Sequence, residues 1–435
     1  MISASGGINK KTSKMREMKN MSNDLVNVVG LGYIGLPTAM MMASHGMRVI
    51  GTDYNPALIE SLQEGHLTFQ EDGLEDLFVQ ARSQGIQFTG DYSDQADIYI
   101  ISVPTPYEKQ SKRINPNYVV AAVKQVLKVC PKGAIVAIES TISPGTIDKF
   151  VRPLVAEQGK KLGEDVHLVH APERIIPGNM VYELLHNSRT IGADDPEVGE
   201  RVKAAYASFC QGEIEVTDIR TAEMTKVVEN TFRDINIAFA NELLKICRSD
   251  GMDVHEIIRI ANKHPRVNIL SPGPGVGGHC ISVDPWFLVG DYPELAHLIH
   301  QARLINDSMP DYVLDRVVEI MGEQGISDFD RVGFYGLTYK ENVDDVRESP
   351  TMQLIESMKR HMANPPKCYD PMVTKKITPR QYQDFSAFLQ DIDLMVVMIP
   401  HNHLLEHCQE MSGKIVLDTR NCGDIWPDTN RIYVL

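Results

Sequence analysis

The sequence predicts an α/β protein with two doubly wound, Rossmann-like parallel sheets joined by a long central helical segment. Two stretches, 25–215 and 316–435, alternate short apolar runs with helical runs, as strands connected by right-handed helical crossovers do. Between them, the chain reads as helix from 220 to about 262, with no β-type run. At 435 residues the chain is also too long for one ordinary core.

The expected elements are assigned from apolar runs and helical periodicity. In the first stretch, strands are predicted at 25–30, 47–53, 97–103, 134–139 and 166–170, with a helix at 36–46. In the second, strands are predicted at 331–337, 367–370, 393–400 and 414–418, with helices at 350–362 and 402–410. The domain boundaries expected are 1–24, 25–215, 216–315 and 316–435, the first being a polar, flexible N-terminal extension.

Composition narrows the class of partner. A net charge of −15 argues against a general nucleic-acid or membrane-surface binder, because such partners need a basic face. The sequence contains no run of eighteen apolar residues, so no membrane-spanning helix is expected. The seven cysteines are scattered and contain no C-x-x-C pair, so we expect neither a disulfide framework nor a metal site. This use of cysteine favours a reducing, cytoplasmic setting.

The long helical stretch also predicts assembly. It is apolar on more than one face, and such a helix usually packs against a partner subunit as well as its own domain. We therefore expect a homodimer built on this segment.

A glycine turn follows the first strand and opens the first helix. Gly30 suits a tight turn, Gly32 lets the backbone approach a pyrophosphate, and Gly35 lets helix and strand pack closely. Asp53, at the end of the next strand, suits the ribose hydroxyls, and no Arg follows it to hold a 2′-phosphate, so NAD is favoured over NADP. The whole turn reads Gly30-Leu31-Gly32-Tyr33-Ile34-Gly35. A solvated strand-end carboxylate is the lesser alternative for Asp53.

Two further segments lie at predicted strand ends. They are 103–106 (VPTP), which contains Thr105, and 139–146 (ESTISPGT), which contains Thr141. Taken singly, each segment is better interpreted as a turn shaped by proline than as a cofactor-binding site. Because ligands bind beyond the carboxyl ends of strands in such sheets, the two together with the glycine turn predict a cofactor cleft.

The stretch 273–286 (GPGVGGHCISVDPW) places a lone cysteine in a glycine-rich loop. Cys280 is positioned like a nucleophile, with Asp284 four residues on. The alternative is a small buried filler, the usual state of a cytoplasmic cysteine, but the neighbouring glycines argue against a plain core position. His279 could tune the thiolate or hydrogen-bond the loop, and the second reading is slightly favoured.

Two other positions carry candidate chemistry. Lys226 and Asn230 are spaced i, i+4 on the long helix, so an ammonium and an amide emerge on one face, where they could hold an oxyanion. A solvated helix face is the ordinary alternative, weakened here by the apolar positions around the pair. Glu173, after the strand at 166–170, is a candidate base.

With these motifs in view, the chain after residue 24 resembles the UDP-glucose/UDP-N-acetylmannosamine dehydrogenase superfamily over nearly its whole length. The matching runs are GLGYIGLP, VPTP, ESTISPGT, APERIIPG, TAEMTKVVENTFRDINIAFANE, PGPGVGGHCISVDPWF and GLTYKENVDDVRESP. PERIIPG and GGHC resemble the branch acting on N-acetylhexosamines, and HPRVNIL and VDPWF resemble the enzymes of UDP-N-acetylmannosamine within it. Ser282 departs from the family pattern, in which many relatives carry Pro or Ala.

The resemblance implies a role for each matching residue. Cys280 matches the nucleophile, Glu173 the general base for hydrolysis, and Lys226 with Asn230 the oxyanion-holding pair. Asp284 and Thr141 match the residues that position water and the lysine. The implied cofactor contacts are Gly30, Gly32, Tyr33, Ile34, Gly35, Asp53, Thr105, Thr141 and Arg347. The implied substrate contacts are Arg174, Lys226, Asn230, Arg266, Gly275, Gly277, Lys340 and Arg420, with Arg266 acting across the dimer.

The resemblance also implies the activity. NAD would bind to 25–215, 216–315 would supply catalysis and dimerisation, and 316–435 would bind the UDP-sugar. The reaction expected is a four-electron oxidation of the C6 alcohol of UDP-N-acetyl-D-mannosamine to the uronate, through a Cys280 thioester, for surface polysaccharide precursors. The alternatives are a UDP-N-acetyl-D-glucosamine 6-dehydrogenase, a two-electron hydroxyacid dehydrogenase, and an NAD-binding regulator without activity.

Overall fold

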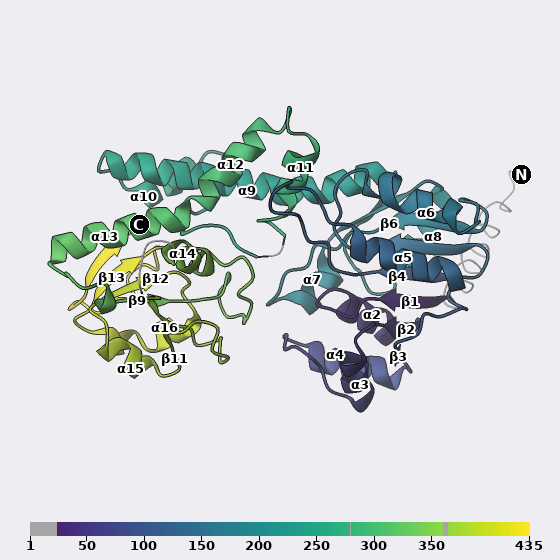
Figure 1. Cartoon of the computed structure of the whole chain (residues 1–435), viewed down its shortest axis with the longest axis horizontal. Helices are drawn as coiled ribbons and strands as arrows, with labels where there is room; N and C mark the ends of the chain where they lie inside the picture. Colours follow the sequence, from purple (N-terminus) through teal and green to yellow (C-terminus); the bar gives the residue numbers. More distant parts are fainter. Residues whose placement is uncertain (1–23, 279, 360–363) are drawn as a thin grey trace, which may run out of the picture. The chain divides into compact units, whose positions relative to one another are not determined.

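The computed structural model describes residues 24–278, 280–359 and 364–435. The chain divides between Val228 and Glu229 into two compact units, each built on its own sheet (Figure 1). Helix α9 (Ile219–Ser249) begins in the first unit and ends in the second. The predicted extension before Asp24, His279, and positions 360–362 of an expected helix lie outside the described residues.

The sheet of the first unit contains the five predicted strands and three others. Its order is β3-β2-β1-β4-β5-β6-β7-β8. The strands are β1 (Leu25–Val29), β2 (Arg48–Thr52), β3 (Gln87–Thr89), β4 (Ile98–Ile101), β5 (Ala134–Ile138), β6 (Val166–His170), β7 (Arg189–Ala193) and β8 (Ile214–Thr217). Neighbours pair in parallel except β6 and β7, which are antiparallel. The expectation of a wholly parallel sheet is wrong at that pair, because an apolar run carries no mark of strand direction.

Alternation along the strands sorts the side chains into two layers. Val26 and Val28 of β1 and Ile98 and Ile100 of β4 belong to one buried apolar cluster, as period-2 geometry requires. Residues of the other strands and of five helices complete the cluster. The helices are α2 (Gly35–Ser44), α3 (Pro56–Glu64), α4 (Leu74–Ser83), α7 (Met180–His186) and α8 (Pro196–Tyr206). Helix α5 (Asn117–Val129) packs on β4 and β5 and on α6 (Arg152–Glu157), which follows a π-helical turn, Ile147–Val151.

The strand order places the cofactor loops together. β1 lies between β2 and β4, so the chain reverses its direction of winding at the β1–β4 pair. The glycine turn follows β1 and the 103–106 segment follows β4. Ligands of open α/β sheets bind at this switch point, beyond the carboxyl ends of the strands.

Helices dominate the start of the second unit. After α9 come α10 (Val254–Ala261), α11 (Asp284–Asp291), α12 (His297–Asp307) and α13 (Met309–Gln324). Asp234 of α9 is fully buried, and its Oδ1 accepts from Arg303 Nη1 at 2.5 Å and from Asn306 Nδ2 at 2.8 Å, both on α12. A buried carboxylate needs such partners because desolvation would otherwise cost several kcal/mol. The ion pair therefore fixes α12 against α9.

A second doubly wound sheet follows, in the order β11-β10-β9-β12-β13-β14 with every pair parallel (Figure 1). Its strands are β9 (Val332–Tyr335), β10 (Lys367–Tyr369), β11 (Gln381–Tyr382), β12 (Leu394–Val397), β13 (Ile415–Asp418) and β14 (Arg431–Val434). Phe334 and Val396 face a core shared with α9, α10, α13 and α14 (Pro350–Met358), whereas Tyr335 and Val397 face α15 (Phe385–Gln390) and α16 (Asn402–Glu406). Two 3-10 turns, Phe329–Arg331 and Cys408–Met411, complete the unit, and the latter takes the end of the helix expected at 402–410.

The two doubly wound sheets and the central helical segment confirm the predicted fold class. Within the described ranges, no helix has the length and apolar character needed to cross a membrane.

Candidate active site

The glycine turn after β1 is shaped for close approach. Gly30 has φ +93°, and a Cβ added there would lie 2.4 Å from Ser102 O. A Cβ on Gly35 would lie 1.9 Å from Gly30 O, so the start of α2 packs directly on the turn. Gly32, in contrast, has no atom within 4 Å of an added Cβ and leaves that side of the backbone open. The turn therefore has the tight side and the open side that a pyrophosphate site needs.

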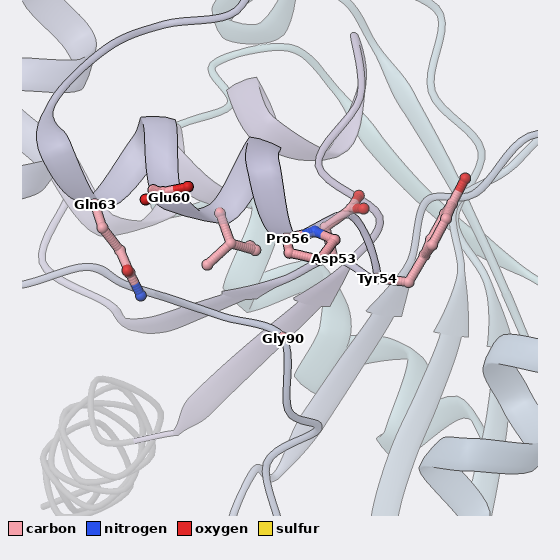
Figure 2. Close-up of a pocket in the computed structure, with 7 residues that line it drawn as sticks. Asp53, Tyr54, Pro56, Glu60, Gln63 and Gly90 are labelled. Atoms are coloured by element: carbon pink, nitrogen blue, oxygen red, sulfur yellow. The ribbon is translucent and has the colours of Figure 1, made fainter.

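Asp53 joins this turn to the end of β2. Its Oδ2 accepts from Leu31 N at 2.8 Å, and its Oδ1 accepts from Asn55 N at 2.9 Å. Beside it is a pocket of about 350 Å³, lined by Asp53, Tyr54, Pro56, Ile59, Glu60, Gln63 and Gly90. Figure 2 shows Glu60 and Gln63 on α3 at one side, while Tyr54 extends away from that helix. The volume is within the range of ligand pockets, so the turn, the acid and the hollow fit the phosphates and a ribose of NAD.

The two segments beyond β4 and β5 are tied to each other and to α9. Ser140 Oγ donates to Val103 O at 2.7 Å and accepts from Val103 N at 2.9 Å, which links the loops that carry Thr105 and Thr141. Both threonines are half-buried. Glu223 of α9, fully buried, accepts from Gly145 N at 2.5 Å and from Ile147 N at 3.0 Å.

Glu173, the predicted base, lies just after β6 and is buried. Its Oε1 accepts from the backbone N–H groups of Arg174 (2.6 Å) and Ile175 (3.2 Å), and its Oε2 forms an ion pair with the Arg189 guanidinium. Arg189 is missing from the sequence-based set because its strand, β7, carries too short an apolar signal to be predicted. The carboxylate that would activate water is therefore held by a buried cation.

The loop after Glu173 is held from two other elements. Glu71 accepts from Gly178 N and Met180 N, each at 3.0 Å, and Glu183 accepts from Ile176 N at 2.9 Å. Neither carboxylate carries a motif that would mark it in the sequence. Within the same unit, Tyr33 of the glycine turn stacks on Phe69 at a ring distance of 4.3 Å, two residues before Glu71.

Arg174, a predicted substrate contact, is half-buried on this loop. Its guanidinium donates to Ser188 O at 2.9 Å and to Thr190 Oγ1 at 2.8 Å. Arg189 lies between these two partners in the chain. Arg174 therefore binds the residues on either side of Arg189, while Arg189 itself pairs with Glu173.

In the second unit, Asn230, Cys280 and Asp284 lie together. Asn230 Nδ2 donates to Asp284 Oδ2 at 2.6 Å, and Asp284 N donates to Cys280 O at 2.8 Å. Asp284 is buried as the first residue of α11, whereas Cys280 is half-buried and forms no disulfide. Lys226 stands one helical turn before Asn230 on α9 and is also buried. Lys226 and Asn230 are therefore both buried, and the alternative of a solvated helix face is wrong.

The cysteine loop packs closely on the segment after β9. A Cβ on Gly277 would lie 2.6 Å from Glu348 O, and Gly275, at φ +135°, would meet Pro350 at 3.2 Å. Gly278 N donates to Arg347 O at 3.1 Å, and Ser282 Oγ donates to Gly278 O at 2.5 Å. The serine that departs from the family pattern thus braces the loop through its own hydroxyl.

The predicted cations of the second unit differ in their surroundings. Arg347 binds Asp345 through Nε (2.8 Å) and Nη2 (2.5 Å), and Lys340 is half-buried. Arg420 is exposed, 3.9 Å from Glu341, and its Nη1 lies 2.9 Å from where a Cβ on Gly273 would be. Arg266 is exposed in the segment between α10 and α11. The structure therefore brings Arg347 and Arg420 to the cysteine loop.

Each unit holds part of the predicted set. The first carries Gly30, Gly32, Tyr33, Ile34, Gly35, Asp53, Thr105, Thr141, Glu173, Arg174 and Lys226. The second carries Asn230, Arg266, Gly275, Gly277, Cys280, Asp284, Lys340, Arg347 and Arg420. Among residues 24–278, 280–359 and 364–435, no group of three or more His, Cys, Asp or Glu side chains is arranged to hold a metal ion.

Comparison with known proteins gives a consistent result. The UDP-glucose/GDP-mannose dehydrogenase family models match over residues 24–210 (NAD binding domain), 220–308 (central domain) and 333–425 (UDP binding domain). A UDP-N-acetyl-D-mannosamine dehydrogenase of Methanococcus maripaludis is 41% identical over 405 residues, covering 91% of this chain and 92% of its own. An NDP-N-acetyl-D-galactosaminuronic acid dehydrogenase of Ralstonia nicotianae is 39% identical over 412 residues, covering 91% and 95%.

Solved structures agree. The native structure of the UDP-N-acetyl-mannosamine dehydrogenase of Staphylococcus aureus matches with a TM-score of 0.82 and 40% identity, over 94% of this chain and 98% of that one. These matches confirm the resemblance inferred from the motifs, and they confirm NAD as the cofactor. The chain belongs to the UDP-glucose/GDP-mannose dehydrogenase family and is an NAD-dependent UDP-sugar dehydrogenase.

Proposed function

We propose that this enzyme oxidises the C6 alcohol of UDP-N-acetyl-D-mannosamine to UDP-N-acetyl-D-mannosaminuronate, with Cys280 holding the half-oxidised sugar. One observation carries the proposal: a half-buried thiol in a glycine loop whose Gly278 N–H donates to Arg347 O and whose Cys280 carbonyl accepts from Asp284 N. An ordinary core cysteine would not need this loop. The relatives named for UDP-N-acetyl-D-mannosamine support the choice of sugar.

The chemistry assigns distinct tasks to the polar groups around α9. When bound, NAD⁺ supplies the hydride acceptor, and two are used per sugar because an alcohol becoming an acid loses four electrons. The C6 hydroxyl gives its proton through water towards Lys226 and Asp284 while a hydride leaves C6, and an aldehyde results. The Cys280 thiolate adds to this aldehyde to give the thiohemiacetal oxyanion, and loss of a second hydride from C6 leaves a thioester. Lys226 and Asn230 stabilise the oxyanion, and Asp284 holds the Asn230 amide in the orientation that lets it donate.

Hydrolysis completes the reaction. Glu173 takes a proton from water, hydroxide adds to the thioester carbonyl, the C–S bond breaks, and the Cys280 thiolate leaves as the acid forms. Thr141 positions the lysine and the water. The loop 173–180, fixed by Glu71 and Glu183, keeps this carboxylate in place.

The binding roles follow the division of the chain. Residues 25–215 hold NAD through Gly30, Gly32, Gly35, Asp53 and the loops of Thr105 and Thr141, with Arg347 as a further contact. Residues 216–315 supply the central catalytic helix, and residues 316–435 hold the UDP group, as the match to a UDP binding domain supports. The cations proposed for the diphosphate and sugar are Arg174, Arg266, Lys340 and Arg420.

We also propose a homodimer, as the sequence predicted. Three large apolar side chains of α9 are exposed: Phe232 (65%), Phe239 (52%) and Ile246 (53%). They follow one another at intervals of seven residues, so they share one face of the helix. An exposed apolar stripe of this kind is typical of a protein interface. Sedimentation should give a dimer for the wild type and a monomer for Phe239→Glu, and a wild-type monomer at micromolar concentration would contradict the proposal. The seven cysteines form no disulfide in the described structure, which agrees with a cytoplasmic enzyme making surface-glycan precursors.

The choice of sugar has a direct test. Purified enzyme is given UDP-N-acetyl-D-mannosamine, UDP-N-acetyl-D-glucosamine and UDP-N-acetyl-D-galactosamine in turn, and the NADH formed per sugar is counted. We expect two NADH per sugar, with the highest kcat/KM on the manno sugar. A preference for the gluco or galacto sugar would reject the substrate, and one NADH per sugar would reject the four-electron route.

A further inference from the structure

A second buried carboxylate lies near Glu173 in the first unit. Glu139 follows β5 directly and is 1% exposed. Its Oε1 accepts from Tyr206 Oη of α8 at 2.9 Å and from Thr38 Oγ1 of α2 at 3.2 Å. No role in the proposed reaction uses this group, although it sits at the end of the strand that leads to Thr141.

Arg189 connects the two carboxylates. Its guanidinium, 4% exposed, forms the ion pair with Glu173 and lies 4.5 Å from the ring centre of Tyr206, whose hydroxyl binds Glu139. It also lies 5.4 Å from the ring of Phe209. One cation thus serves two buried carboxylates, and with both ionised the cluster carries an excess negative charge away from water. Such a charge is costly, so one proton is retained near neutrality.

The proton is retained on Glu139. Burial first, and then the charge of Glu173, raise the pKa of Glu139 to about 7, while Arg189 and the Tyr206 hydrogen bond pull it down. Coupling between two titrating groups is reciprocal. The ionised carboxylates of Glu139 and Glu173 therefore disfavour each other's charge.

We infer that Glu139 is a positioning residue for Glu173: through Arg189, its charge state sets how strongly Glu173 takes the proton from the hydrolytic water. With Glu139 neutral, Arg189 neutralises Glu173 alone, and Glu173 is a weak base. With Glu139 ionised, the same cation is shared, and Glu173 becomes a stronger base. This inference rests on the proposed function, because it concerns the hydrolysis of the Cys280 thioester.

The other groups around Glu139 keep one charge state across neutral pH. On β6, burial lowers the pKa of His170 to about 3, so its imidazole is neutral. On α8, burial raises the pKa of Tyr206 well above its ordinary value, so its hydroxyl keeps its proton. On β7, Arg189 stays charged, with the Cys210 thiol beside it, and Thr38 of α2 and Ser102 after β4 carry no charge. Glu139 is therefore the group in this cluster that changes charge near pH 7.

The test measures single-turnover hydrolysis of the Cys280 thioester between pH 5.5 and 8.5, with release of the uronate followed by rapid quench. The wild-type rate constant should rise about three- to tenfold through pH 7 as Glu139 ionises. Glu139→Gln, which mimics the protonated acid, should stay on the low plateau with NAD binding unchanged. Glu197→Gln, an exposed change on the same helix as Tyr206, should keep the wild-type step.

A second variant keeps the test decisive if Glu139→Gln folds poorly. Tyr206→Phe retains the ring under Arg189 but removes the hydrogen bond that lowers the pKa of Glu139, so the step should move to higher pH. An unmoved step in Tyr206→Phe, or a wild-type step in Glu139→Gln, would overturn this inference and leave the proposed function standing. Absence of any thioester in the wild type would overturn both.

Discussion

Asn230 Nδ2 donates a 2.6 Å hydrogen bond to Asp284 Oδ2, and both side chains are buried. The bond joins α9 to the first residue of α11, whose N–H donates to the carbonyl of Cys280. It therefore fixes, in one contact, the amide proposed to hold the oxyanion and the turn that presents the thiol. The first prediction follows from this contact.

Asp284→Ala, which removes the acceptor, should lower kcat about ten- to a hundredfold with little change in KM for the UDP-sugar. A hydrogen bond to a charged partner is worth about 1.5–3 kcal/mol, and its loss lets the Asn230 amide turn away from the reacting carbon. Steady-state kinetics checks the split between kcat and KM. Glu294→Gln, an exposed change after the same helix, is the control and should behave as wild type. A loss confined to KM would place Asp284 in substrate binding instead.

Two alanine substitutions in the glycine turn should fail in different ways. Gly35→Ala puts a Cβ 1.9 Å from Gly30 O, so the turn and α2 must separate, and the protein should lose both NAD binding and thermal stability. Gly32→Ala has free space around its Cβ, so the fold should survive while NAD affinity drops, because the methyl group occupies the phosphate side. Melting temperature and NAD titration separate the two. Unchanged NAD affinity in Gly32→Ala would contradict the placement of the pyrophosphate.

The buried Glu139 should also make stability depend on pH. Its pKa is about 7 in the folded protein against an ordinary 4.5, so the folded state binds the proton more tightly than the unfolded state. The contribution of Glu139 to stability therefore falls as pH rises from about 4.5 to 7, by roughly 3 kcal/mol in total, and stays constant above that. Glu139→Gln removes this term. Urea unfolding should show it gaining on wild type between pH 5 and 8, and parallel pH profiles would contradict the assignment.

The ion pair between Arg303 and Asp234 offers a test of the central helices. Arg303→Met leaves a buried carboxylate with its main cation removed and should destabilise the protein by about 3–5 kcal/mol. Adding Asp234→Leu to this variant should recover much of the loss, since both charges are then gone. Denaturant midpoints of the two variants give the comparison. A double variant no more stable than Arg303→Met would show that the pair does more than neutralise charge.

The sequence predicted those parts of the fold that depend on a local pattern of residues. The glycine turn, Asp53 and the alternation of strands and helices follow from spacing and apolar periodicity, so both sheets and the long helix could be placed. The antiparallel β7 could not, because direction is settled by a connection through a short helix, α7, and not by the strand's own residues.

The candidate site was predictable to the same extent. Cys280, Lys226 and Asn230 stand in runs that mark them, and Asn230 and Asp284 do meet. Arg189, Glu139, Glu223 and Glu71 could not be found, because each acts on a partner between 16 and 109 residues away in the chain. Long-range pairing of this kind is decided by how the strands and helices pack, and a single sequence carries no direct sign of it.

The most direct measurement of the central claim is the intact mass of the Glu173→Gln enzyme during turnover. With UDP-N-acetyl-D-mannosamine and NAD⁺, the hydrolytic step should be slow, and the protein should gain the mass of the UDP-sugar acyl group on Cys280. The same treatment of Cys280→Ser should leave its mass unchanged while NAD still binds. Unmodified Glu173→Gln protein throughout turnover, or full acid production by Cys280→Ser, would contradict the account.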